Sequence, residues 1–115
     1  MRIGIIGSRE LDGGEDRCYK KICENVPANC TEIVSGGADG IDTLAEKYAR
    51  ENALLFKRFE PDYYKYGKSA PLMRNAQIID YADFILAFWD GKSRGTAHVI
   101  KICCEIGKPL EIIFI

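Results

Sequence analysis

Short apolar runs alternate with segments of helical spacing along the chain. Runs rich in β-branched and aromatic residues predict five strands, over residues 2–6, 32–35, 53–59, 83–89 and 110–115. Apolar positions that recur every three to four residues predict helices over 15–26, 41–49, 71–81 and 95–106. The polar and aromatic stretch PDYYKYGKSA, residues 61–70, predicts a loop.

The strict alternation of strands and helices predicts the fold class. Strands that are apolar along their whole length indicate a parallel sheet covered by helices on both faces. Right-handed crossovers then favour the strand order 3-2-1-4-5. We therefore expect an α/β fold, a Rossmann-like three-layer α/β/α sandwich with a five-stranded parallel sheet. Residues 1–115 are expected to form a single domain.

Loops rich in glycine and hydroxyl residues follow the first, second and fourth strands, with the sequences GSRE, SGGADGID and WDGKSRGT. The carboxyl ends of parallel strands meet at one edge, where open α/β sheets bind ligands. The last two loops open helices, whose N-termini favour phosphate, and Asp39 or Gly40 is expected to cap the first of these helices. The residues expected to bind phosphate or nucleotide are Gly7, Ser8, Arg9, Ser35, Gly36, Gly37, Asp39, Gly40, Asp90, Gly91, Ser93, Arg94, Gly95 and Thr96. Ordinary turns would use the same glycines.

The stretch before the third helix adds further candidates. Tyr63, Tyr64 and Tyr66 interleave with Lys65 and Lys68, a pattern that suits base stacking beside phosphate. The alternative is a surface loop whose tyrosines cover the helix below. Arg74 and Asn75 fall in the first turn of a helix that starts at the ligand edge, so we add them to the binding residues.

Composition limits the classes of function. The net charge of −1 argues against nucleic-acid binding through the whole surface, although a local basic site remains open. The chain shows no apolar run long enough for a membrane helix, and its N-terminus turns polar too early for a signal peptide. Five cysteines without a CxxC pair predict reduced thiols and a cytoplasmic protein. We expect no metal site, because ligand spacing and histidine partners are missing.

Several familiar motifs are absent. SGGADG is not GxGxxG and follows the second strand, which excludes the dinucleotide fingerprint. Both GKS tripeptides lack the earlier glycine of a Walker A loop. His98 is the sole histidine and has no nucleophile elbow, so a surface or packing role is expected for it.

SGGADGID, YGKSAPLMRN and ADFILAFWDGKSRGT together resemble the SLOG superfamily, which unites DprA, the LOG phosphoribohydrolases and short stand-alone YspA-type proteins. The chain looks most similar to the YspA type. The resemblance implies that Ser35, Gly36, Gly37 and Gly40 cradle phosphate, as the DprA loop does for nucleic acid. It also implies a homo-oligomer, because LOG-type relatives assemble.

The LOG motifs match only in part. Arg74 matches the LOG arginine, and Gly91, Gly95 and Thr96 align with the motif PGGxGTxxE. Asp90 replaces the proline of that motif, and Val99 stands where the catalytic glutamate should be. A LOG-type hydrolase needs a carboxylate to assist departure of the base from ribose. The carboxylates that could replace the glutamate are Asp39, Asp42, Glu46 and Asp90.

Three functions follow from these observations. The first is binding of a nucleotide or nucleotide derivative, without a further cofactor. The alternatives are a LOG-type hydrolase of the nucleotide N-glycosidic bond and, second, a DprA-like protein that binds single-stranded nucleic acid. Release of free base would mark the hydrolase, and a steep salt dependence would mark nucleic-acid binding. Arg74→Ala is expected to weaken ligand binding with little loss of fold.

Overall fold

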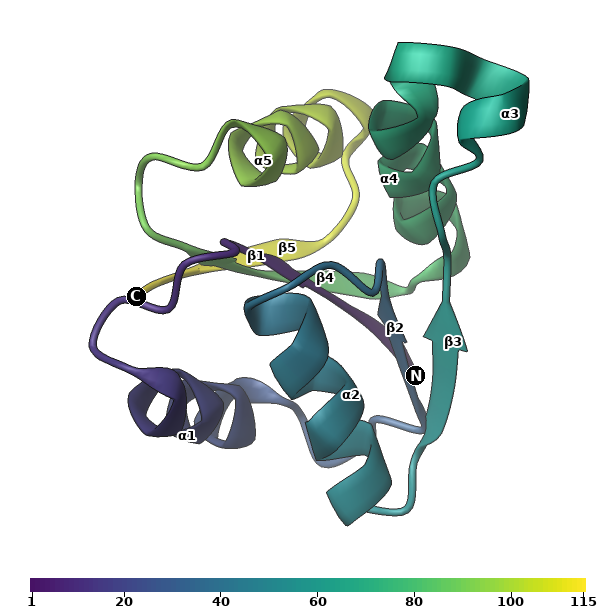
Figure 1. Ribbon diagram of the computed structural model, residues 1–115. Helices are drawn as coiled ribbons and strands as arrows, with labels where there is room; N and C mark the ends of the chain where they lie inside the picture. Colours follow the sequence, from purple (N-terminus) through teal and green to yellow (C-terminus); the bar gives the residue numbers. More distant parts are fainter.

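The computed structural model describes residues 1–115 and contains one five-stranded parallel sheet with the order β3-β2-β1-β4-β5 (Figure 1). Its strands are β1 (Arg2–Gly7), β2 (Glu32–Ser35), β3 (Leu55–Arg58), β4 (Phe84–Trp89) and β5 (Leu110–Phe114). Its helices are α1 (Glu15–Asn25), α2 (Ile41–Glu51), α3 (Tyr63–Tyr66), the 3-10 turn η1 (Gly67–Ser69), α4 (Ala70–Tyr81) and α5 (Arg94–Ile106). The predicted Rossmann-like fold and strand order are confirmed.

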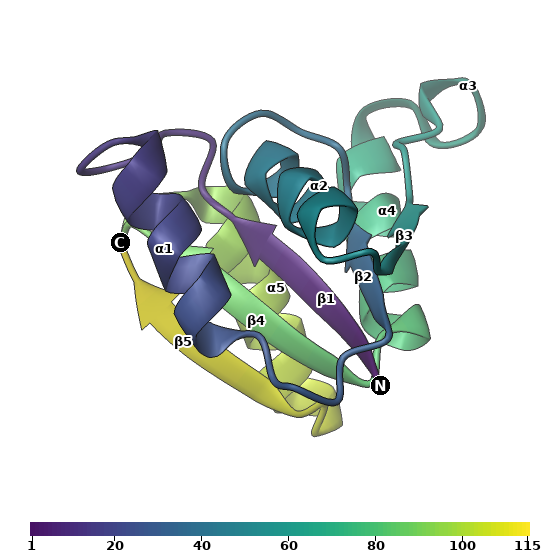
Figure 2. The ribbon, with the colours of Figure 1, turned by 90° about the horizontal axis from the view of Figure 1, so that it is seen from below.

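The helices cover the two faces of the sheet in pairs. In Figure 1, α4 and α5 lie above the sheet, and α1 and α2 lie below it. Figure 2, seen from below, shows α1 and α2 in front of the strands. Each face has its own apolar cluster, with Phe88 and Ile22 among the buried residues on one side and Ile85 and Val99 on the other. Because β1 and β4 are central, their residues supply both clusters.

The edge strands are less buried than their apolar sequences predict. In β3, Phe56 is half-buried while Leu55, Lys57 and Arg58 are exposed, and the exposed fraction of Leu55 is 69%. In β5, Phe114 is 62% exposed, although its ring lies 5.8 Å from that of Trp89. The helices therefore leave much of both edge strands exposed.

The prediction of a loop over 61–70 is wrong. Residues 63–66 form the single-turn helix α3, and η1 follows directly before α4. Asp62 begins α3, and its Oδ1 accepts a hydrogen bond from the Lys65 N–H at 3.1 Å. An Asx cap of this kind converts a polar segment into a helical turn without any apolar repeat. The third strand is also shorter than predicted, because Ala53 has a φ of 53° and belongs to the turn after α2.

The structure also bears on the expectations about membrane helices, cysteines and metal ligands. None of the helices is long and apolar enough to cross a membrane. All five cysteines are free, and no group of His, Cys, Asp and Glu side chains is arranged to hold a metal ion.

Candidate functional site

Ser8 ties together the three loops at the carboxyl edge of the sheet. Its N–H donates to Phe88 O, its carbonyl accepts from the Ile41 N–H at 3.2 Å, and its Oγ accepts from the Asp90 N–H at 3.1 Å. Gly40 has a φ of 78° and caps α2 without a side chain. A Cβ on Gly40 would lie 2.5 Å from Ser8 O, so a glycine is required for this close approach. Ser8 and Gly40 therefore fix the three loops relative to one another.

Two carboxylates of the chain accept hydrogen bonds from backbone N–H groups of the loops. Asp42 Oδ2 accepts from the Ala38 N–H at 3.1 Å, and Asp90 Oδ1 accepts from both the Lys92 and Ser93 N–H groups at 2.8 Å. The bonds from Ser93 and Lys92 lower the pKa of Asp90 below its ordinary value. The loop N–H groups of Ala38, Lys92 and Ser93 are thus already paired within the protein, which the sequence did not indicate.

Asp42 is the most buried acidic group of this edge. Asp42 is only 7% exposed. Burial raises the pKa of Asp42, while the bond from Ala38 and the charge of Arg74 act in the opposite direction. Ser35 is fully buried and donates its Oγ hydrogen to Ile5 O at 2.9 Å. The Ser35 hydroxyl therefore links β2 to β1, and Asp42 contributes a carboxylate to the site.

Two arginines lie over consecutive glycines. Arg74, 9% exposed, donates from Nη1 to Gly36 O at 2.8 Å and from Nε to Asn75 Oδ1 at 2.8 Å. Arg58 donates from Nη2 to Gly37 O at 3.3 Å. A Cβ on Gly36 would lie 2.4 Å from Arg74 Nη1, and one on Gly37 would lie 2.1 Å from Arg58 Nε. The space that the glycines leave free is therefore filled by guanidinium groups.

Two adjoining cavities open at this edge. The first, of about 430 Å³, we call the carboxylate cavity; its charged lining residues are Arg9, Glu10, Asp42, Arg74, Asp90 and Lys92. The second, of about 350 Å³, we call the arginine cavity; its charged lining residues are Arg9, Arg58, Glu60 and Arg74. The cavities adjoin because Arg9, Ala38, Pro71 and Arg74 line both.

The charges divide unequally between the cavities. In the carboxylate cavity, three cationic and three acidic side chains give a formal sum of zero. In the arginine cavity, three arginines and one glutamate give a formal sum of +2. The arginine cavity is therefore the part of the edge that favours an anion.

Most of the predicted binding residues fall at these cavities. Those that line the carboxylate cavity are Gly7, Arg9, Arg74, Asn75, Asp90, Ser93, Gly95 and Thr96, and those that line the arginine cavity are Arg9, Gly36, Gly37, Tyr63 and Arg74. The predicted residues that line neither are Ser8, Ser35, Asp39, Gly40, Gly91, Arg94, Tyr64 and Tyr66.

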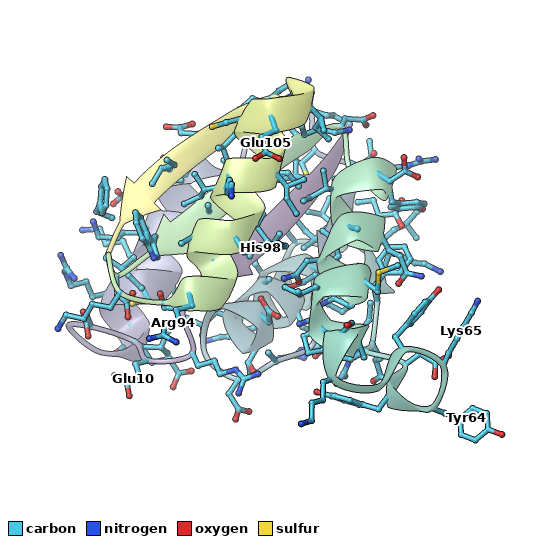
Figure 3. The ribbon with its side chains drawn as sticks, turned by 90° about the horizontal axis from the view of Figure 1, so that it is seen from above. Glu10, Tyr64, Lys65, Arg94, His98 and Glu105 are labelled. Carbon is cyan, nitrogen blue, oxygen red and sulfur yellow. The ribbon has the colours of Figure 1, made fainter.

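Four of these outlying residues lie on the surface, namely Asp39, Gly91, Arg94 and Tyr64. Asp39 and Arg94 are exposed, and Gly40 rather than Asp39 caps α2. Tyr64 is fully exposed and points away from the molecule (Figure 3). Of the three tyrosines, Tyr63 alone is positioned at a cavity.

The prediction from the sequence did not include Arg58 and Glu60, which line the arginine cavity. It named Asp42, which lines the carboxylate cavity, only as a possible substitute for the LOG glutamate. A charged residue at the carboxyl end of a predicted strand was the signal for Arg58, since the third strand ends at the same edge as the others. Val99 is fully buried in an apolar cluster, so the position of the LOG glutamate holds no carboxylate and faces the core.

Comparison with known proteins gives three matches. Residues 1–57 match the family model of DNA recombination-mediator protein A. The Gene 61 protein of Mycobacterium phage D29 is 32% identical over 84 residues, which are 68% of this chain and 67% of that protein.

The third match is a solved structure, that of DNA processing protein A from Helicobacter pylori, described for its single-stranded DNA binding mode. It aligns with a TM-score of 0.71 at 23% identity over 97% of this chain, which spans 64% of that protein. The structural match supports the fold, and the sequence matches support the relationship. The chain belongs to the DprA-like SLOG superfamily.

Proposed function

We propose that the chain binds single-stranded DNA through the crevice formed by the two cavities. The observation that carries the proposal is the convergence of Arg9, Arg58 and Arg74 on one cavity at the ligand edge of the sheet. Guanidinium groups bind phosphate through paired hydrogen bonds and keep their charge when half-buried. The solved DprA of the same fold binds single-stranded DNA, which supports this ligand over the free nucleotide that the sequence ranks first.

A local basic cavity reconciles this proposal with a net charge of −1. Non-specific single-strand binding needs only a charged groove that follows the backbone and an aromatic ring for stacking. Tyr63, 60% exposed at the rim of the arginine cavity, is placed for such stacking beside Arg74. The proposal therefore predicts a short binding site rather than a surface coated with cations.

A free nucleotide is the second candidate. It is favoured by the carboxylate cavity, where Ser93 and Thr96 at the start of α5 offer hydroxyl groups. The hydrolase alternative would need Asp42, the buried carboxylate of this cavity, in place of the missing glutamate. Chromatography for free base, run on the same mixtures as the binding assay, separates hydrolysis from binding.

The test is a titration with an oligothymidylate, a dinucleotide and a mononucleotide at several salt concentrations. If three arginines contact phosphates, log K for the oligonucleotide should fall against log salt with a slope of about −2, from about −0.7 per phosphate. Equal affinity for the mononucleotide and the oligonucleotide, with a flat salt response, would replace DNA by a nucleotide ligand.

Finer placements remain predictions. The YspA-type subgroup, LOG-like features and a homo-oligomer follow from the resemblance alone, and the single-domain organisation is expected from the length of the chain. Light scattering of the purified protein measures the oligomeric state directly.

A further inference from the structure

We propose that the arginine cavity is the phosphate subsite of the crevice, with Arg58 as a phosphate ligand and Glu60 as its internal competitor. The carboxylate cavity then receives the sugar and base next to that phosphate. This assignment rests on the proposed function, because it names which part of a nucleic-acid ligand enters which cavity. It places the phosphate at the end of β3, away from Asp42 and Asp90.

The electrostatics of the two cavities separate the ligand in this way. Asp42 and Asp90 line the carboxylate cavity and already accept the N–H groups of Ala38, Lys92 and Ser93. A phosphate in that cavity would face two carboxylates, and like charges at close range disfavour binding. Carboxylate and hydroxyl oxygens instead accept hydrogen bonds from the N–H groups of bases, among them the ring N3–H of thymine.

Arg58 is held at the rim in a position suited to phosphate. Its Nη2 donates to Gly37 O at 3.3 Å, and its Nε lies 3.0 Å from Glu60 Oε1. These contacts use part of the five N–H donors of a guanidinium group. The Arg58 side chain is 44% exposed, so its remaining donors reach solvent and the cavity. Since Arg74 lies over the neighbouring Gly36, the two guanidinium groups lie over consecutive glycines and line the same cavity.

The Glu60 carboxylate pairs with the Arg58 guanidinium in the way that an external anion would. Its side chain is 66% exposed, and ion pairs this exposed are weak and screened by salt. A phosphate that bridges Arg58 and Arg74 gains two charged partners and can displace the single carboxylate. Glu60 therefore lowers the affinity for phosphate without blocking it. This gives the substitution Glu60→Gln an expected direction opposite to that of Arg58→Gln.

The experiment follows the Nε–Hε signals of the arginines by NMR while inorganic phosphate is added to the full chain. The Arg58 and Arg74 signals should shift, and the signal of Arg50, exposed at the far end of α2, should not. Arg58→Gln should weaken phosphate binding about tenfold, the loss of one exposed charge-assisted hydrogen bond. Glu60→Gln should tighten it about two- to fivefold. The charge-matched controls are Arg50→Gln and Glu105→Gln, the latter at the opposite end of α5 from Arg94 (Figure 3).

The same variants are then titrated with the oligothymidylate. Loss of DNA affinity in Arg58→Gln, beyond that in Arg50→Gln, supports the subsite. DNA binding that responds equally to Arg58→Gln and Arg50→Gln overturns it and leaves the proposed function intact. Phosphate binding that depends on Arg58, without any DNA binding, keeps the anion subsite and refutes the proposed function. An unchanged phosphate affinity in Glu60→Gln refutes its role as a competitor, and that exposed change does not threaten the fold.

Discussion

A single methyl group at Gly36 should test how the site is built. Gly36 lies under the buried guanidinium of Arg74, and a Cβ there would lie 2.4 Å from Nη1 and 2.8 Å from Cζ. Its φ is outside the left-handed region, so alanine meets no backbone strain. Gly36→Ala therefore acts through the displacement of Arg74, which breaks the hydrogen bond from Nη1 to Gly36 O.

The magnitude follows from that hydrogen bond. A hydrogen bond to a charged group contributes about 1.5–3 kcal/mol. The lower chain entropy of unfolded alanine offsets about 0.4–1 kcal/mol. The net loss of stability should be about 1–2 kcal/mol. At about 2.1 cal/mol/K for each of 115 residues, this lowers Tm by about 4–8 °C. DNA affinity should fall about tenfold, because Arg74 leaves the cavity wall it shares with Arg9.

Thermal unfolding and the oligothymidylate titration measure both effects. Because Gly95 lines the carboxylate cavity, the control for DNA affinity is Arg50→Gln, and the control for unfolding is Gly95→Ala, in the first turn of α5, where an added Cβ meets nothing within 4 Å and no positive φ is required. That change should leave stability equal or raise it by up to about 1 kcal/mol through helix propensity. If Gly36→Ala unfolds and binds as the wild type does, Arg74 is not held by this glycine and our description of the site is wrong.

Further predictions concern the charged groups of the crevice. Arg74→Ala should lower the free energy of unfolding by about 2–4 kcal/mol in a denaturant titration, because two hydrogen bonds of a buried guanidinium are removed. The same change should weaken DNA binding. Unaltered stability would instead support the small effect on the fold that is expected from the sequence. The raised pKa of Asp42 means that the native state holds a proton more tightly than the unfolded state, so stability should fall as pH rises above 3.8 toward the raised value. In Asp42→Asn this decline should shrink, and an identical pH profile in both proteins would count against a raised pKa. Asp90→Ala should cost about 1–2 kcal/mol in the same denaturant titration, since two loop N–H groups lose their acceptor, whereas no loss would show that water replaces it.

The fold was predictable because its signals are local. The apolar runs at 2–6 and 83–89 and the helical repeats between strands set the alternation, and crossover handedness set the strand order. The helical turn at 63–66 escaped prediction because one Asp62 cap, rather than a periodic pattern, forms it. The uneven burial of β5 was also hidden, since an edge strand and a central strand can have the same composition.

The site was predictable in position but not in chemistry. Glycine content located the loops, yet it could not show that Gly36 and Gly37 make room for arginines from α4 and β3. Arg58 is 21 residues from the Gly37 carbonyl it contacts, so no spacing rule connects them. The pairing of Asp42 and Asp90 with loop N–H groups likewise depends on backbone conformation. Charge partition between the cavities therefore became visible only in three dimensions.

Trp89 offers the most direct measurement of the central claim. It is the sole tryptophan, and its indole N–H donates to Ser93 O at 3.0 Å beside the carboxylate cavity. Its fluorescence should change on titration with an oligothymidylate, with an affinity that falls as salt rises and that decreases in Arg74→Ala and Arg58→Gln but not in Arg50→Gln. Binding that ignores salt and survives both crevice substitutions, or no binding at any salt concentration, would contradict the account.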